Sequence, residues 1–272
     1  ATGPRVRLHG DPHIEQFFVS DGIRGLADFD DAAVGPPALD LARFTASVLL
    51  AARLNAFDDK RSDELVGDLF RGYRAGLGGA KLDKKAPGFA AKLTEKFKSD
   101  RKGFVLAIEN TLDPVDAQER SFVEEEIAAY VGSLGKGEPK RPATFFDIKN
   151  LGRTKLGVGS ALTRKYIVRL EGKTTSDDDD LIVELKEIVD MSAVPCVEGI
   201  PSGAADARLA MQQASGDKEL LKPALLPDGK FWVNEWLVNY EEARIKKLMP
   251  ADLHDLVYEA GIALANVHLT PL

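Results

Sequence analysis

The sequence has little of what marks secreted and membrane-spanning proteins. It contains one cysteine, Cys196, which cannot form a disulfide within the chain, so a reducing compartment is favoured. The first twenty residues include Arg5, Arg7 and Asp11 and lack the apolar core of a signal peptide. No apolar run approaches the roughly 18 residues of a membrane span. We therefore expect a cytoplasmic protein without a membrane partner.

The chain also lacks the excess of basic residues that nucleic-acid-binding proteins normally show. It has 36 Lys and Arg against 43 Asp and Glu, which gives a formal net charge of -7. We therefore expect no nucleic-acid partner. Its 272 residues are 44% hydrophobic, which suffices for a buried core in one large soluble domain or in two lobes.

The most informative stretch is His9-Gly10-Asp11-Pro12-His13. An apolar run at Phe17–Ser20 follows, then an Asp-Gly pair typical of a two-residue hairpin turn, and then a returning run at Ile23–Phe29. Because a tight hairpin brings its ends together, the loop that carries Asp11 should meet the strand end that carries Asp28. Two carboxylates placed in this way can accept a proton from a nucleophile and hold a divalent cation on a phosphate.

Helical periodicity fills most of the remaining first half of the chain. A helix over about 38–54 is apolar around much of its circumference, which predicts that it is buried. One apolar stripe contains Leu39, Ala42, Ala46 and Leu49, and a second beside it contains Leu41, Val48 and Ala52. Asp40 lies near its start, either as a partner for the His9 loop or only as a helix cap; both interpretations stay open. Further helices are predicted over 61–78, over 81–110 and from an Asp113-Pro114 start to about 134.

Alternating patterns mark the second half, after a Gly- and Pro-rich break at 135–142. Strands are predicted at 165–171, 181–186 and 231–237. The acidic run Asp177–Asp180 between the first two is expected to be a solvated turn rather than a cation site. A last helical stripe from Leu253 to Val267 ends at His268. We expect His254 on the surface of this helix and His268 at its end.

A phosphate-binding pattern lies around the first two of these strands. The glycines of a turn let backbone N–H groups approach a phosphate, and a lysine at the end of the next strand can reach it as a point charge. Arg164 adds charge or packs on the strand, and both remain open. The lysine is Lys186, and Asp206 and Glu198 are alternative ion-pair partners for it. The nucleotide-binding candidates are the turn residues Gly157, Gly159 and Ser160, then Arg164, Lys186, and Glu235 in a strand whose backbone could cradle the nucleobase.

The His-Gly-Asp-x-His loop, the Asp28-Phe29-Asp30 segment and Gly35-Pro36-Pro37 with Asp40 together resemble the catalytic half of aminoglycoside-phosphotransferase-like, protein-kinase-like enzymes. The wider chain looks similar to the bacterial domain-of-unknown-function 2252 family. The resemblance implies that Asp11 is the catalytic base and that Asp28 and Gln16 hold Mg²⁺ on the phosphates of ATP. In the kinase-like enzymes that the loop resembles, an asparagine normally stands at the position of Gln16.

The order of these parts is reversed relative to the usual kinase-like chain, so we predict a circularly permuted, two-lobed α+β fold. Residues 1–140 would form the helical large lobe, 141–240 the β-rich small lobe, and 241–272 a helix returning to the large lobe. Leu264–His268 resembles the helix that precedes the loop in relatives. The alternative is that the true small lobe is missing and the likeness after residue 150 is accidental.

The leading functional hypothesis is an ATP- and Mg²⁺-dependent phosphotransferase acting on a hydroxyl group of a small molecule. A second hypothesis is a nucleotide-binding pseudokinase, because Gln16 replaces asparagine and Glu184 stands where kinases have a small residue under the base. The third is a metal-dependent phosphoesterase that uses His9, Asp11, His13 and Asp28 as ligands.

Overall fold

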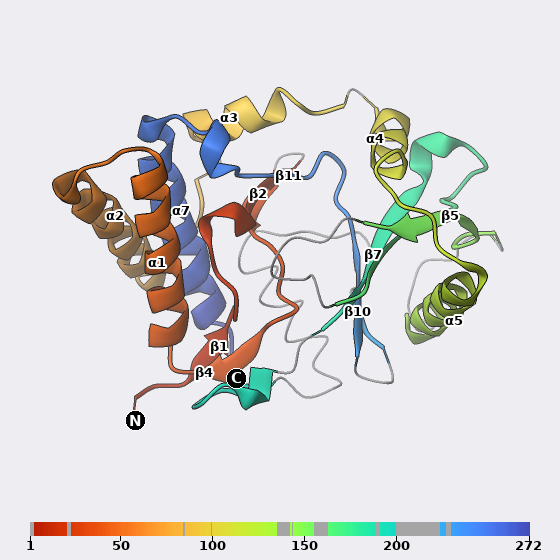
Figure 1. The fold of residues 1–272 in the computed structure, drawn as a ribbon, viewed down its shortest axis with the longest axis horizontal. Coiled ribbons are helices and arrows are strands. Elements are labelled where there is room, and N and C mark those ends of the chain that lie inside the picture. The colour runs from red at the N-terminus through yellow and green to blue at the C-terminus, as the bar shows by residue number, and fades with distance from the viewer. Residues whose placement is uncertain are drawn as a thin grey trace. The chain divides into compact units, whose positions relative to one another are not determined.

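The computed structural model describes residues 3–20, 23–83, 85–98, 100–134, 142, 144–154, 163–188, 191–199, 224–226 and 230–272. The chain forms two compact units (Figure 1). The first unit holds the described residues of 1–96, 190–218 and 239–272, and the second holds those of 97–189 and 219–238. The lobe boundaries at residues 140 and 240 stay a prediction.

Four helices build most of the first unit: α1 (Ala38–Leu54), α2 (Asp59–Leu77), α3 (Gly88–Thr94) and α7 (Pro250–His268). Figure 1 shows α1, α2 and α7 side by side. Glycines allow close contact between α2 and α7, since a Cβ on Gly72 would lie 2.0 Å from the Tyr258 carbonyl oxygen. The helix predicted over 61–78 is confirmed as α2, and Leu65, Leu69 and Tyr73 form its buried face.

Two small antiparallel sheets complete this unit. One has the order β1 (Val6–Leu8), β4 (Ala33–Gly35), β8 (Glu198–Gly199), and the other the order β11 (Glu241–Glu242), β2 (Phe17–Ser20), β3 (Ile23–Leu26). β2 and β3 pair from Phe17 opposite Leu26 to Ser20 opposite Ile23, which confirms the predicted hairpin strands. The Asp-Gly turn at 21–22 lies outside the described residues.

Helix α1 has the predicted bounds, but it buries Val48 and Ala52 of the second predicted stripe rather than the first stripe. Leu39 is 38% exposed, and Ala42 and Ala46 are exposed as well. Because α1 is apolar on several sides, periodicity alone did not select the buried stripe. The hydrogen bonds of Asp40 turn its own side inward, and the residues that follow it at helical spacing form the core face: Phe44, Val48, Ala51 and Ala52.

The second unit is built on a five-stranded antiparallel sheet with the order β5, β6, β7, β10, β9. The bounds are β5 Ile148–Arg153, β6 Lys165–Leu170, β7 Leu181–Glu187, β9 Ala224–Leu225 and β10 Phe231–Glu235. One cluster of buried side chains joins the sheet to α5 (Ala117–Ser133) and includes Val123, Ile127 and Tyr130. Phe104 and Val105 of α4 (Arg101–Glu109) pack on Ile167 and Ile182. Three of these strands, β6, β7 and β10, confirm the predicted ones.

Two helix predictions were wrong in detail. The helix predicted over 81–110 is two helices, α3 and α4, separated near Asp100, whose side chain caps α4. Asp113 does not start α5: its backbone pairs with Arg153 at 2.9 Å in both directions. Asp116 starts α5 instead, because with Glu119 it forms a capping box that satisfies backbone N–H groups at both positions.

The described part of the chain therefore contains six α-helices and three antiparallel sheets, which confirms the mixed α+β class. The kinase-like circular permutation stays a prediction. Among the described residues, no helix has both the length and the apolar character needed to cross a membrane.

Candidate functional site

The His9–His13 loop is held by a buried carboxylate from the first turn of α1. The His9 amide donates to Asp40 Oδ2 at 2.7 Å and the Gly10 amide donates to Asp40 Oδ1 at 3.2 Å. Asp40 is 1% exposed, and the N-cap of α1 is Pro37, which makes no side-chain cap bond. Of the two interpretations of Asp40, the loop partner is confirmed and the helix cap is wrong.

The same loop lies against the segment that follows β3. The buried His9 ring contacts the Ala27 carbonyl through Nε2 at 2.9 Å and packs on Phe29 with ring centroids 4.5 Å apart. Gly10 has a φ of +90°, and a Cβ there would lie 1.9 Å from the Asp31 carbonyl oxygen. Only glycine therefore permits this close approach.

Three carboxylates act electrostatically on the His9 ring. Burial lowers the pKa of His9, whereas the negative charges of Asp40, Asp28 and Asp11 act in the opposite direction. The loop and the end of the hairpin thus bring Asp11 and Asp28 within electrostatic reach of one imidazole. Asp11 is about one quarter exposed and forms an ion pair with Arg43 of α1.

Asp28 is held in an uncommon backbone conformation. Its φ is +67°, in the left-handed region that costs a non-glycine residue energy. Its Oδ2 accepts a hydrogen bond from Gln16 Nε2 at 2.9 Å. Gln16 is brought there by the hairpin pairing, since the Ala27 amide donates to the Gln16 carbonyl at 3.0 Å. The two side chains predicted as Mg²⁺ ligands are therefore in direct contact.

The Asp28 carboxylate and the Gln16 amide oxygen are both suitable ligands for a hard cation. In the contact as it stands, the glutamine offers N–H to the carboxylate. A shared cation would require the amide to turn so that its oxygen faces the metal. Among the described residues, no group of three or more His, Cys, Asp and Glu side chains could hold a metal ion.

His268 lies at the end of α7 as expected, but sequence reasoning missed its burial and its partners. The side chain is 1% exposed; Nε2 lies 3.0 Å from Asp40 Oδ2, and Nδ1 lies 2.7 Å from the Tyr73 hydroxyl. His254 also has a buried partner, because its Nδ1 lies 2.6 Å from Asp68 Oδ2. The likeness of Leu264–His268 to the helix that precedes the loop in relatives was the signal that pointed to His268.

In the second unit, the strand that carries Lys186 pairs with β10, the strand whose backbone was predicted to cradle the nucleobase. In the β7–β10 register, Lys186 lies opposite Trp232 and Glu184 lies opposite Asn234. Both charged side chains are buried, at 8% and 5% exposure. Lys165 Nζ lies 2.7 Å from Glu184 Oε2. This ion pair neutralises the carboxylate that stands where kinases have a small residue.

The structure places two further candidates in packing or ion-pair roles. Arg164 stacks on the Phe122 and Phe231 rings at 4.9 and 4.8 Å and pairs with Glu187, and its role at a nucleotide stays a prediction. The Glu235 side chain is 1% exposed and lies 3.4 Å from the Arg101 guanidinium.

Of the two partners considered for Lys186, Glu198 forms an ion pair with Arg5 at 3.0 Å. The other, Asp206, lies outside the described residues, as do Gly157, Gly159 and Ser160. The role of the glycine turn therefore stays a prediction.

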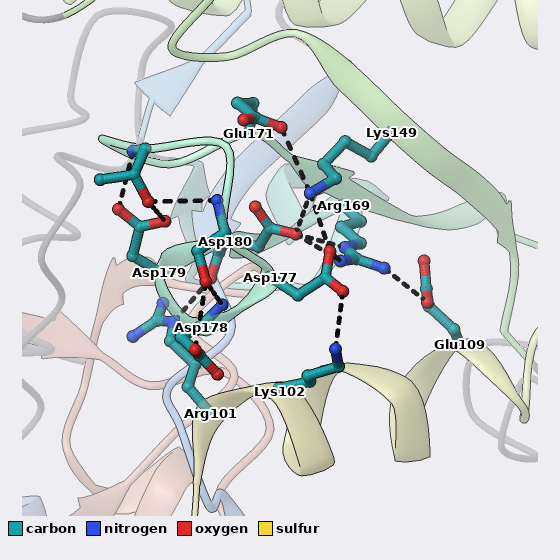
Figure 2. A network of polar contacts seen from close by, with 12 residues as sticks. Arg101, Lys102, Glu109, Lys149, Arg169, Glu171, Asp177, Asp178, Asp179 and Asp180 are labelled. Atoms are coloured by element: carbon teal, nitrogen blue, oxygen red, sulfur yellow. Dashed lines mark hydrogen bonds and ion pairs between the residues drawn. The ribbon is translucent and has the colours of Figure 1, made fainter.

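The acidic run is not a bare solvated turn, because basic side chains bind its carboxylates (Figure 2). Lys149 from β5 lies within 3.2 Å of Asp177, Asp180 and Glu171. Arg169 from β6 bonds the same two aspartates and also Glu109 of α4.

Helix α4 adds a further cation to this network: Lys102 lies 3.2 Å from Asp177 (Figure 2). The hydrogen bonds from Lys149 and Lys102 lower the pKa of Asp177 to about 2. The run therefore ties α4 to the sheet through ion pairs.

The N-terminal part of the chain has known relatives. The model of a family described as uncharacterized protein conserved in bacteria (DUF2252) matches residues 1–102. The match covers the His9–His13 loop, the β2–β3 hairpin, α1 and α2, which supply most of the site in the first unit. No curated protein and no solved structure matches the chain. The predicted family resemblance is thus confirmed over residues 1–102, the part of the chain that is similar to the DUF2252 family.

Proposed function

We propose that the protein is an ATP- and Mg²⁺-dependent phosphotransferase of kinase-like mechanism, acting on a hydroxyl group of a small molecule. The observation that carries the proposal is the bonding of Asp40 to the backbone of His9 and Gly10. These bonds hold the loop that presents Asp11, while the hairpin presents Asp28 beside the same imidazole. Phosphoryl transfer needs this kind of positioning and charge neutralisation more than covalent chemistry.

In this proposal Asp11 accepts or orients the proton of the acceptor hydroxyl. Arg43, its ion-pair partner, is about half exposed, so it can move aside when substrate binds. Asp28 and Gln16 would hold the cation, which neutralises charge on the transferred phosphoryl group when bound. Lys186, together with Gly157, Gly159 and Ser160, would bind the nucleotide phosphates, and the backbone near Glu235 would bind the base.

The C-terminal contacts support the circular permutation that the proposal requires. His268, at the end of α7, bonds to the same Asp40 that holds the loop. The Arg7 side chain bonds to the Pro271 carbonyl, and Figure 1 draws the C-terminus beside β1 and β4. The helix that resembles the one before the loop in relatives therefore ends beside that loop, as a rewired chain requires.

A second candidate function is a nucleotide-binding pseudokinase. Two observations favour it: Gln16 presents its N–H group to Asp28, and the buried Glu184, paired with Lys165, stands at the strand position predicted to lie under the base. Such a protein would bind a nucleotide without transferring its phosphate.

Calorimetry with Mg·ATP, together with ADP release in the presence of a panel of hydroxyl compounds, tests these functions. We expect Asp28→Asn to weaken Mg²⁺-dependent ATP binding at least tenfold. Asp11→Asn should keep binding and lower turnover by about 10²–10⁴-fold, the usual contribution of a general base. Asp63→Asn, at an exposed position of α2, is the matched control.

Each outcome of this experiment has a defined meaning. ATP binding by the wild type with no turnover above that of Asp11→Asn would favour the pseudokinase. No binding of ATP by the wild type, with or without Mg²⁺, would rule out both functions.

A further inference from the structure

Tyr73 and His268 form a buried pair behind the His9–His13 loop. The Tyr73 hydroxyl lies 2.7 Å from His268 Nδ1, and the two rings meet edge to face with centroids 5.6 Å apart. Tyr73 is 8% exposed and His268 is 4% exposed. The other nitrogen of the imidazole, Nε2, faces Asp40. One imidazole therefore connects a phenol on α2 to the carboxylate that holds the loop.

For a neutral His268 ring, counting hydrogens fixes the arrangement of these bonds. An ionised carboxylate only accepts hydrogen bonds, so the contact at Asp40 Oδ2 requires a hydrogen on His268 Nε2. A neutral imidazole with its hydrogen on Nε2 has a lone pair on Nδ1, which needs a donor when buried. The Tyr73 hydroxyl supplies that donor. Burial and the charge of Asp40 both raise the pKa of Tyr73, so the phenol keeps its proton.

The opposite tautomer would be unfavourable at both ends. A hydrogen on Nδ1 would force the phenol to turn its own hydrogen away into a buried site. The lone pair on Nε2 would then face the Asp40 carboxylate at 3.0 Å. That carboxylate would be repelled at the oxygen that also accepts from the His9 amide.

We propose that Tyr73 is a positioning residue, which fixes the Nε2–H tautomer of His268 and thereby keeps Asp40 aligned with the His9 and Gly10 amides. The effect on the loop stands on the geometry alone, and its consequence for phosphoryl transfer rests on the proposed function. Tyr73 does not touch the loop itself among the described contacts, so it acts through His268 and Asp40.

NMR of protein labelled with ¹⁵N at histidine and at the backbone tests this proposal. In the wild type, the ring nitrogens of His268 should show the hydrogen on Nε2 and a hydrogen bond accepted by Nδ1. In Tyr73→Phe, the Nδ1 signal should shift because its donor is gone. The His9 and Gly10 amides should move and exchange about tenfold faster, whereas the Phe18 amide in the hairpin should stay unchanged.

A double-mutant comparison separates the tautomer effect from loss of packing. His268→Gln places an amide N–H where Nε2 lies, and this donor needs no tyrosine to fix it. Tyr73→Phe should therefore have little further effect on the His9 and Gly10 amides in the His268→Gln background. An equally large effect in both backgrounds would overturn the proposal, because Tyr73 would then act by packing.

Two further results would overturn it: protonation of His268 at Nδ1 in the wild type, or unchanged loop amides in Tyr73→Phe. The position of the His268 ring hydrogen in the wild type can overturn the proposal even if Tyr73→Phe does not fold. Turnover is measured separately. Absence of turnover in the wild type would overturn the proposed function, whereas wild-type turnover in Tyr73→Phe with displaced loop amides would overturn only the catalytic consequence.

Discussion

Replacement of Asp40 by asparagine is the most demanding test of how the loop is held. Asp40 accepts three hydrogen bonds, from the His9 amide at 2.7 Å, the Gly10 amide at 3.2 Å and His268 Nε2 at 3.0 Å. Asparagine has one acceptor oxygen. If that oxygen takes the place of Oδ2, two bonds survive without the charge and the new NH₂ group faces the Gly10 amide.

The magnitude follows from these bonds. A hydrogen bond to a charged group contributes about 1.5–3 kcal/mol and a neutral one about 0.5–1.5 kcal/mol, so two weakened bonds cost about 2 kcal/mol. The unsatisfied buried donor at Gly10 adds about 1–3 kcal/mol. We expect a total loss of about 3–5 kcal/mol, although Asp40→Asn is nearly isosteric.

Urea unfolding followed by circular dichroism measures this loss, with Asp63→Asn as a control expected to stay within about 0.5 kcal/mol of the wild type. Amide exchange at His9 and Gly10 should accelerate in Asp40→Asn and not in the control. A loss below about 1 kcal/mol with unchanged amide exchange would refute the view that Asp40 holds the loop.

Two other predictions concern packing and charge. Gly67 in α2 is exposed, and a Cβ there would have nothing within 4 Å, so Gly67→Ala should stabilise the protein by about 0.5–1 kcal/mol in urea unfolding. In Gly72→Ala the new Cβ would meet the Tyr258 carbonyl oxygen, so this variant should be strongly destabilised. Equal effects of the two substitutions on stability would contradict the α2–α7 packing. The Asp177 carboxyl has its folded pKa lowered to about 2 by Lys149 and Lys102, so its stabilising contribution is present above pH 4 and is lost as the pH falls to about 2. A ¹³C titration of Asp177 should find this depressed midpoint, and Lys149→Met should raise it towards the ordinary aspartate value; an unchanged midpoint would exclude Lys149 as the cause.

Much of the fold could be predicted because its signals are local. Residues that are close in sequence predict the Asp-Gly hairpin, the helix α2 that ends at Gly78, and the alternating strands β6 and β7. The stripe of α7 also has strong helical periodicity, and its predicted residues are buried.

The errors arose where several local choices were nearly equal. Helix α1 is apolar on more than one side, and the hydrogen bonds of Asp40 to a loop 30 residues earlier selected the face that includes Phe44. Asp113 and Asp116 are both plausible helix starts, and only Asp116 has Glu119 three residues later to complete the capping box.

The site was least predictable where partners come from distant parts of the chain. His268 is 228 residues from Asp40, and no local pattern states that the two side chains meet. Likewise, the run Asp177–Asp180 reads as a solvated turn until Lys149 and Arg169 from β5 and β6 are placed beside it. Asp11 and Asp28, which a single hairpin connects, were accessible to sequence reasoning.

A crystal structure of the protein with Mg²⁺ and a non-hydrolysable ATP analogue tests the central claim most directly. The account predicts one cation bound to Asp28, the terminal phosphate beside Asp11, and the inner phosphates within reach of Lys186. A nucleotide bound away from Asp28, or no bound nucleotide at saturating concentration, would contradict it.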